Sequence, residues 1–177
     1  MSFKIGIVLG STREGRASES VGKWVMDHTK NTEEVTYEIV DIKDYDLPFF
    51  GTSNDNVAIT KWNQKLSELD GFIFVVAEYN HSMTGALKNA LDLSQEAWNN
   101  KSAGIVSYGS AGGARAAEHL RGILSELQIA SVRTHILLSL FDDFENYSFK
   151  PRNIHDKNLN MLFDQVANWA KALKTLR

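Results

Sequence analysis

The feature that most constrains the fold is a series of short apolar runs separated by segments with a helical pattern. Residues 72–77 (FIFVVA) form a continuous apolar run, and residues 3–9 and 103–107 are two further apolar runs. Short continuous runs are typical of parallel strands that are covered on both faces. Residues 35–42 alternate more, which favours a strand nearer a sheet edge, and residues 132–140 form the last run.

Between these runs, apolar residues recur at helical spacing. The clearest helical stripe consists of Ala116, Leu120, Ile123, Leu124 and Leu127. Strands that alternate with helices predict a parallel sheet with helices on both faces, because right-handed crossovers allow few other arrangements. Neither a linker nor a repeat divides the chain, so we predict a single α/β domain over residues 1–177.

Charge and cysteine content exclude several classes of function. The formal net charge is -3, so there is no basic excess to neutralise a nucleic-acid backbone. The chain has no cysteine, which excludes disulfides, thiolate metal ligands and cysteine nucleophiles. The apolar segment at residues 3–9 is too short to span a membrane. We therefore expect a cytoplasmic protein that binds neither nucleic acid nor membranes.

Ligands of open parallel sheets bind beyond the carboxyl ends of the strands, at the point where the strand order reverses. The loop after the first strand, residues 10–18 (GSTREGRAS), is suited to a phosphate group. Ser11 and Ser18 offer hydroxyl donors, and Arg13 and Arg16 offer guanidinium groups beside a helix start. The loop lacks the dinucleotide and nucleoside-triphosphate motifs, so a phosphomonoester fits better. The alternative is a solvated loop with a serine cap and surface arginines.

The loop after the third strand, residues 77–85 (AEYNHSMTG), brings an aromatic ring, an amide and an imidazole to the same edge. A flat ring system can pack on Tyr79 and accept hydrogen bonds from nearby backbone N–H groups. The alternative makes Tyr79 a half-buried anchor and Asn80 a turn residue. For His81 we favour a structural role. We expect no metal site, because no second cluster of ligands accompanies Asn80 and His81.

The loop after the fourth strand, residues 107–115 (SYGSAGGAR), contains three glycines that let the backbone approach a ligand closely. The alternative is a flexible turn between a strand and a helix. Arg115 either meets a cofactor phosphate or is a solvated helix residue.

Together these segments resemble the NADPH-dependent FMN reductase family, which includes quinone, azo-dye and chromate reductases. The resemblance is carried by residues 77–82, by Gly85 and by residues 87–92 (LKNALD). The glycine-serine-x-arginine pattern of the first loop is matched by Gly10, Ser11 and Arg13. The resemblance covers about residues 3 to 130. One departure is Ala77, because the family usually has proline at this position.

The resemblance implies a flavodoxin-like three-layer sandwich with a five-stranded parallel sheet in the order 2-1-3-4-5. It implies that Ser11 and Arg13 contact the FMN phosphate, with roles for Arg16 and Ser18 less defined because the loop is longer here. One side of the isoalloxazine ring is then lined by Glu78, Tyr79, Asn80 and His81. A second flavin-contacting segment includes Ser107, Tyr108, Gly109 and Gly112.

The implied activity is transfer of hydride from NADPH or NADH, through bound FMN, to a small acceptor such as a quinone, free flavin, azo compound or metal oxyanion. We expect ping-pong kinetics and no catalytic side chain, because the flavin carries the chemistry. The alternatives are a flavodoxin-like electron carrier that docks on protein partners and a flavin-free regulatory protein.

The resemblance also implies a homodimer or homotetramer. Candidate interface residues are the aromatic side chains Phe49, Phe50, Trp98, Phe141, Phe144 and Tyr147, with a place in the core as the alternative. Residues 142–146 (DDFEN) are interpreted as an exposed acidic loop that shapes the pocket entrance of a neighbouring subunit.

Overall fold

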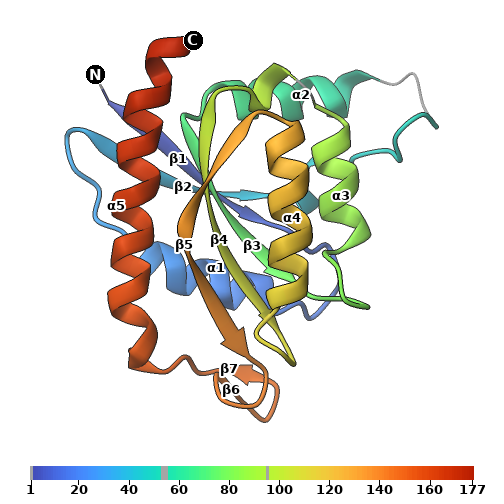
Figure 1. Ribbon diagram of the computed structural model, residues 1–177. Coiled ribbons are helices and arrows are strands. Elements are labelled where there is room, and N and C mark those ends of the chain that lie inside the picture. Colours follow the sequence, from blue (N-terminus) through green and yellow to red (C-terminus); the bar gives the residue numbers. More distant parts are fainter. Residues whose placement is uncertain (1, 53–55, 95) are drawn as a thin grey trace.

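A five-stranded parallel sheet in the order β2-β1-β3-β4-β5 forms the centre of the molecule (Figure 1). The structure is a computed structural model that describes residues 2–52, 56–94 and 96–177. Its sheet strands are β1 (Phe3–Leu9), β2 (Val35–Asp41), β3 (Gly71–Ala77), β4 (Lys101–Gly109) and β5 (Ile129–Ser139). All four neighbouring pairs are parallel, which confirms the predicted sheet and its strand order.

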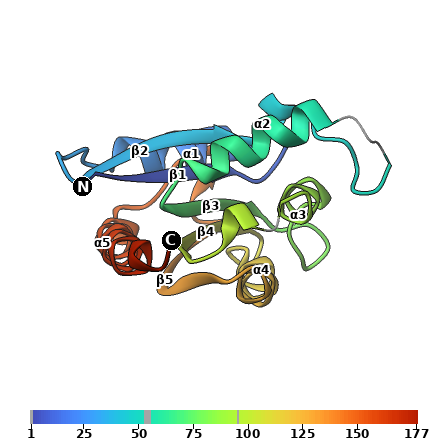
Figure 2. The ribbon, with the colours of Figure 1, turned by 90° about the horizontal axis from the view of Figure 1, so that it is seen from above.

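Helices cover both faces of this sheet (Figure 2). The first face carries α1 (Ser18–Asp27) and α5 (Asp156–Leu173), and the second carries α2 (Asn56–Ser67), α3 (Gly85–Asp92) and α4 (Ala114–Glu126). Short 3-10 helices are η1 (Ile42–Tyr45), η2 (Glu96–Trp98), η3 (Asn153–His155) and η4 (Lys174–Leu176). A two-stranded hairpin, β6 (Phe144–Glu145) and β7 (Ser148–Phe149), lies between β5 and α5 and was not predicted.

Each face of the sheet has its own apolar core. Under α2, α3 and α4 the core contains a cluster of aromatic rings, in which Trp98 packs edge-on against Trp62 and Phe72. Under α1 and α5 the core is mainly aliphatic, and α5 lies very close to β4 at Gly104. A Cβ atom at Gly104 would come within 2.8 Å of Leu162 Cδ2 and 2.9 Å of Val166 Cγ2, so a larger residue there would force these side chains of α5 to shift.

The strand boundaries follow the burial of the chain. Every residue of β3 and β4 is buried, as the continuous apolar runs predict, whereas β2 is half-exposed at the edge of the sheet. The apolar run at residues 103–107 underestimates the length of β4, because the first two residues of the strand, Lys101 and Ser102, are polar yet buried. No helix in the described part of the chain is long and apolar enough to cross a membrane.

Candidate functional site

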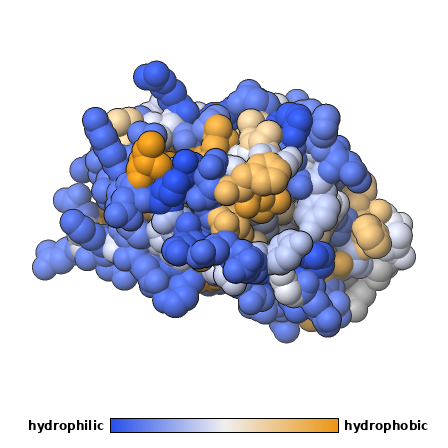
Figure 3. Space-filling view, turned by 90° about the horizontal axis from the view of Figure 1, so that it is seen from below, coloured by the Kyte–Doolittle hydropathy of each residue, from blue (hydrophilic) through white to orange (hydrophobic). Residues whose placement is uncertain are grey.

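The carboxyl ends of β1, β3, β4 and β5 border one cleft of about 720 Å³. A cleft of this size is typical of sites for small ligands and cofactors. Figure 3 views the molecule from below, the side toward which β4 and β5 run in Figure 1, and shows apolar patches among hydrophilic side chains. The lining residues are Ser11, Arg13, Gly15, Arg16, Ala17, Ala77, Glu78, Tyr79, Tyr108, Gly109, Leu140, Phe141, Phe144, Asn146 and Tyr147.

The loop between β1 and α1 is held against β3 by its first residue. The Gly10 N–H donates to the Val75 carbonyl at 3.0 Å, and the Gly10 carbonyl accepts from the Thr84 hydroxyl. A Cβ atom at Gly10 would come within 2.8 Å of the Val75 oxygen, so only glycine allows this approach. The next residue, Ser11, is buried at the cleft.

Arg13 is exposed at the cleft and makes no ion pair or hydrogen bond with any described residue. The backbone N–H groups of Ser11, Thr12 and Arg13 also donate to no residue in the described ranges. Helix α1 begins at Ser18, and its N-cap residue, Ala17, supplies no side-chain hydrogen bond to the helix start. Free N–H groups, a free guanidinium and a helix start are the donors that bind a phosphate group. These residues therefore fit the phosphate of a mononucleotide.

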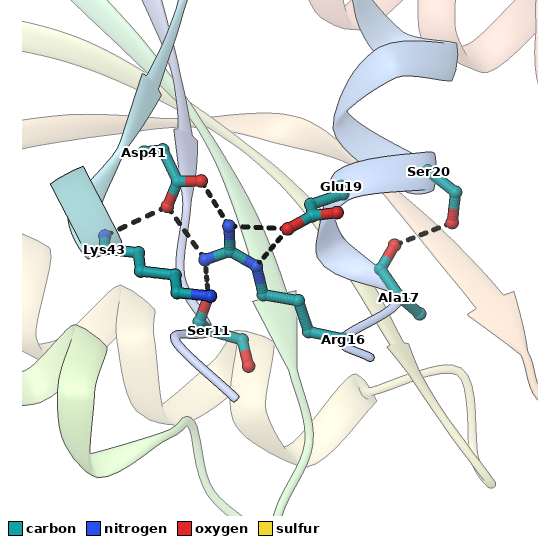
Figure 4. Close-up of polar contacts among 7 residues, drawn as sticks. All are labelled: Ser11, Arg16, Ala17, Glu19, Ser20, Asp41 and Lys43. Atoms are coloured by element: carbon teal, nitrogen blue, oxygen red, sulfur yellow. Dashed lines mark hydrogen bonds and ion pairs between the residues drawn. The ribbon is translucent and has the colours of Figure 1, made fainter. Parts of the chain in front are cut away.

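Arg16 reaches the cleft but has other partners (Figure 4). Its guanidinium forms ion pairs with Asp41 at the end of β2 and with Glu19 in α1, and it donates to the Ser11 carbonyl. Sequence analysis grouped Arg16 with the phosphate ligands because its carboxylate partner Asp41 lies 25 residues further along the chain, where the sequence gives no sign of the contact. Ser18, another predicted ligand, is fully buried near the Tyr108 hydroxyl and does not line the cleft.

The loop between β3 and α3 contains a tight turn. Tyr79 and Ser82 exchange two backbone hydrogen bonds, of 2.8 and 2.9 Å, and both central residues have positive φ, 46° at Asn80 and 67° at His81. This backbone directs Tyr79 to the cleft, whereas Asn80 and His81 are exposed and do not line it. The structure thus separates residues that the sequence grouped together.

Glu78 lies in the same loop, and its carboxylate is bound to helix α4. Arg115 donates to it from Nε at 2.7 Å and from its backbone N–H at 3.2 Å. Burial would raise the pKa of Glu78, but these hydrogen bonds and the charge of Arg115 hold the pKa below its usual range. Glu78 therefore remains ionised at the cleft, and Arg115 pairs with it instead of being a free surface residue.

The loop between β4 and α4 supplies Tyr108 and Gly109 to the cleft. Burial, with a smaller contribution from Tyr79, raises the pKa of Tyr108 to about 12, so its hydroxyl keeps its proton at neutral pH. Gly112 has φ of 68° and its carbonyl accepts from the Ser107 hydroxyl at 2.8 Å. Ser107 and Gly112 therefore shape this loop from behind, without lining the cleft themselves.

Sequence reasoning missed the wall formed by residues 140–147. Leu140, Phe141, Phe144, Asn146 and Tyr147 all line the cleft of their own chain. Trp98, by contrast, is fully buried in the core, which corrects its assignment to an interface. The local signal was weak. Asn146 is a residue type favoured in turns, but the strands Phe144–Glu145 and Ser148–Phe149 are too short to show an apolar pattern.

Asp143 anchors this wall. Its complete burial corrects the expected exposure at this one position, whereas Asp142, Glu145 and Asn146 are exposed as expected. The Asp143 carboxylate accepts from the Ser139 N–H at 2.9 Å, from Arg152 Nε at 3.1 Å and from His155 Nε2 at 2.9 Å. Burial would raise the pKa of Asp143, but the hydrogen bonds from Arg152, His155 and Ser139 keep it below its ordinary value.

Comparison with known proteins identifies the family. The sequence model of the NADPH-dependent FMN reductases matches residues 3–143. The chain belongs to this family. Among the relatives of this chain, an NAD(P)H-dependent FMN reductase of Schizosaccharomyces pombe is 34% identical in an alignment of 146 positions that covers 77% of this chain and 73% of the relative. A quinone reductase of Pseudomonas putida is 28% identical and covers 96% of this chain and 95% of the relative.

Solved structures agree on the fold of this FMN reductase family member. A flavoenzyme NAD(P)H:(acceptor) oxidoreductase from Paracoccus denitrificans superposes with a TM-score of 0.77 at 17% identity. The match covers 96% of this chain and 98% of that chain. This likeness shows a flavodoxin-like architecture, as the sequence predicted.

Proposed function

We propose that this protein is an NAD(P)H-dependent reductase that binds FMN in the cleft at the carboxyl edge of its sheet. Its acceptor is a small molecule such as a quinone, a free flavin, an azo compound or a metal oxyanion. The observation that carries the proposal is the family match over residues 3–143, together with the free guanidinium of Arg13 at one end of the cleft.

In this proposal Ser11, Arg13 and the free N–H groups of the first loop hold the phosphate. Tyr79, Tyr108 and Gly109 line the part of the cleft that is left for the flavin ring. When bound, FMN supplies the hydride chemistry, so the side chains need only bind, orient and exclude water.

The ionisation states of the cleft suit this role. Tyr108 keeps its proton because burial raises its pKa to about 12, so its hydroxyl can donate a hydrogen bond. Glu78 is held ionised by Arg115, so it cannot act as a proton donor. Phe141 and Tyr147 are 80% and 101% exposed, and their rings can cover a flat ligand from the open side.

The decisive experiment uses the full chain loaded with FMN and mixed with NADPH without oxygen. We expect the visible flavin absorbance to bleach and then to return when a quinone is added. Initial rates at several quinone concentrations should give parallel double-reciprocal lines, because one site serves donor and acceptor in turn. Intersecting lines would contradict this mechanism, and repeating the assay with NADH ranks the two donors.

The competing function is a flavodoxin-like electron carrier. A carrier binds FMN but needs a separate reductase, so its flavin would stay yellow with NADPH alone. The modest net charge of -3 and the arginine in the phosphate loop favour the reductase.

We also propose a homodimer or homotetramer. Phe49 and Phe50 are 73% and 64% exposed on a loop away from the cleft wall, and exposed aromatic residues are frequent at interfaces. Light scattering of the purified protein measures the particle mass. The cytoplasmic location expected from the sequence stays a proposal that cell fractionation tests.

A further inference from the structure

We propose that Arg16 is a positioning residue, which holds the first loop in its phosphate-binding shape without contacting the phosphate. This inference rests on the proposed FMN site. It also assigns a role to Asp41, which lies at the end of β2 and does not line the cleft.

All the donors of Arg16 are already in use (Figure 4). A guanidinium has five N–H donors. Nε donates to Glu19 Oε1 at 3.0 Å, and Nη2 donates to the same oxygen at 2.8 Å and to Asp41 Oδ2. Nη1 donates to Asp41 Oδ1 at 2.8 Å and to the Ser11 carbonyl. With five bonds made, no N–H of Arg16 is left for a ligand.

The contact with Ser11 orients the loop. In a trans peptide the C=O and the following N–H point in opposite directions. Because the Ser11 carbonyl is turned onto Arg16, the Thr12 N–H is turned to the opposite side, and it donates to no residue in the described ranges. Arg16 therefore fixes the direction of one of the free donors that the phosphate needs.

Burial and charge also indicate that Arg16 shapes the loop and that Arg13 binds the phosphate. The Arg16 side chain is 3% exposed and Asp41 is 14% exposed, so the fork-to-fork pair is shielded from solvent and rigid. Two carboxylates surround this single guanidinium, so the cluster offers no net positive charge to a phosphate. Arg13 supplies that charge, and Arg16 supplies the geometry.

The test compares FMN with riboflavin, which has the same ring system and lacks the phosphate. Both are titrated against the flavin-free full chain by flavin fluorescence, for the wild type and for Arg16→Lys, Asp41→Asn, Arg13→Ala and Lys101→Met. Lys101 is a buried cation at the opposite edge of the sheet and serves as the matched control.

Arg16→Lys keeps the charge but cannot form the fork, so we expect FMN affinity to fall about 10- to 100-fold, as it does when outer-shell partners are lost in metal sites. Riboflavin affinity should change less than about 2-fold, and Lys101→Met should change neither. Asp41→Asn should behave like Arg16→Lys with a smaller loss.

The dependence of FMN affinity on salt concentration distinguishes a positioning residue from a residue that contacts the phosphate. Arg13→Ala should flatten the dependence of FMN affinity on salt, because a screened charge contact is lost. Arg16→Lys should lower FMN affinity by the same factor at every salt concentration. An equal loss of FMN and riboflavin affinity, or a flattened salt dependence for Arg16→Lys, would overturn the inference.

If Arg16→Lys does not fold, the same two comparisons on Asp41→Asn decide the question. Failure of the proposed function itself looks different. In that case the wild type would bind FMN no better than riboflavin.

Discussion

Among the residues that the structure describes, two cations are buried, one near the carboxyl ends of the sheet strands and one at their amino ends. Arg16 lies near the carboxyl ends of the strands and is 7% exposed as a whole residue. Its guanidinium donates hydrogen bonds to two carboxylates and a carbonyl. Lys101, at the amino edge, is 3% exposed, and its Nζ donates to the Leu66 carbonyl at 2.6 Å and lies 5.7 Å from the Phe72 ring centre. Only the first cation has an ion-pair partner among the described residues.

Their pKa values shift in opposite directions. Burial alone would lower the pKa of Arg16, but hydrogen bonds and charges from Asp41 and Glu19 raise it above its ordinary value. Burial lowers the pKa of Lys101 to about 8, and the positive charge of Arg177 adds to the effect. The protein thus neutralises the buried charge beside the cleft, whereas the buried charge at the other edge costs stability.

The largest expected effect is on stability after Arg16→Met. This change leaves Asp41 shielded from water without its partner, which typically costs about 3 to 5 kcal/mol of unfolding free energy. Urea unfolding of the wild type and the variant measures the loss. A loss below about 1 kcal/mol would show that the buried pair is not coupled to folding, and the contrast with Lys101 would disappear.

A smaller effect, of opposite sign, is expected for Lys101→Met. In the folded state Lys101 loses its proton near pH 8, whereas in the unfolded chain it does so near its ordinary value of 10.5. Between these values the unfolded state binds more protons, so wild-type stability should rise with pH by up to about 3 kcal/mol. Methionine removes that rise and should make the protein more stable at pH 7. Parallel pH–stability curves for the two proteins would contradict this assignment.

The smallest expected effect is that of Glu19→Gln, which tests the outer side of the Arg16 cluster. The Glu19 side chain is 63% exposed, so solvent screens its ion pair and the loss should stay below about 1 kcal/mol. Glutamine also keeps an oxygen that can accept from Arg16. Urea unfolding and FMN titration measure both consequences. A loss of FMN affinity as large as that of Asp41→Asn would move the main anchor of the loop from Asp41 to Glu19.

Much of the fold could be predicted because its cause is local. The continuous run at residues 72–77 requires burial on both faces, and alternating strands and helices then lead to the parallel sheet. The cleft was found for the same reason, since loops after neighbouring parallel strands meet at one edge.

The partners of charged residues could not be predicted, because these residues are far apart in the sequence and become neighbours only in the folded sheet. Arg16 meets Asp41 because β1 and β2 are neighbours and Asp41 ends the second strand. Asp142 and Asp143 are the same residue type at adjacent positions. Asp143 is buried and bonds Ser139, Arg152 and His155, whereas Asp142 is exposed and lies 3.7 Å from the guanidinium of Arg152. Composition alone cannot tell such neighbours apart.

The Asp143 anchor makes the β6–β7 hairpin a natural place for diversification. Its carboxylate fixes the two ends of the segment, at Ser139 and at Arg152, so the support lies at the base of the hairpin. The tip residues Asn146 and Tyr147 are exposed and face the cleft from there. Evolution or a protein engineer can therefore exchange the tip to suit a differently shaped acceptor while the sheet beneath stays intact.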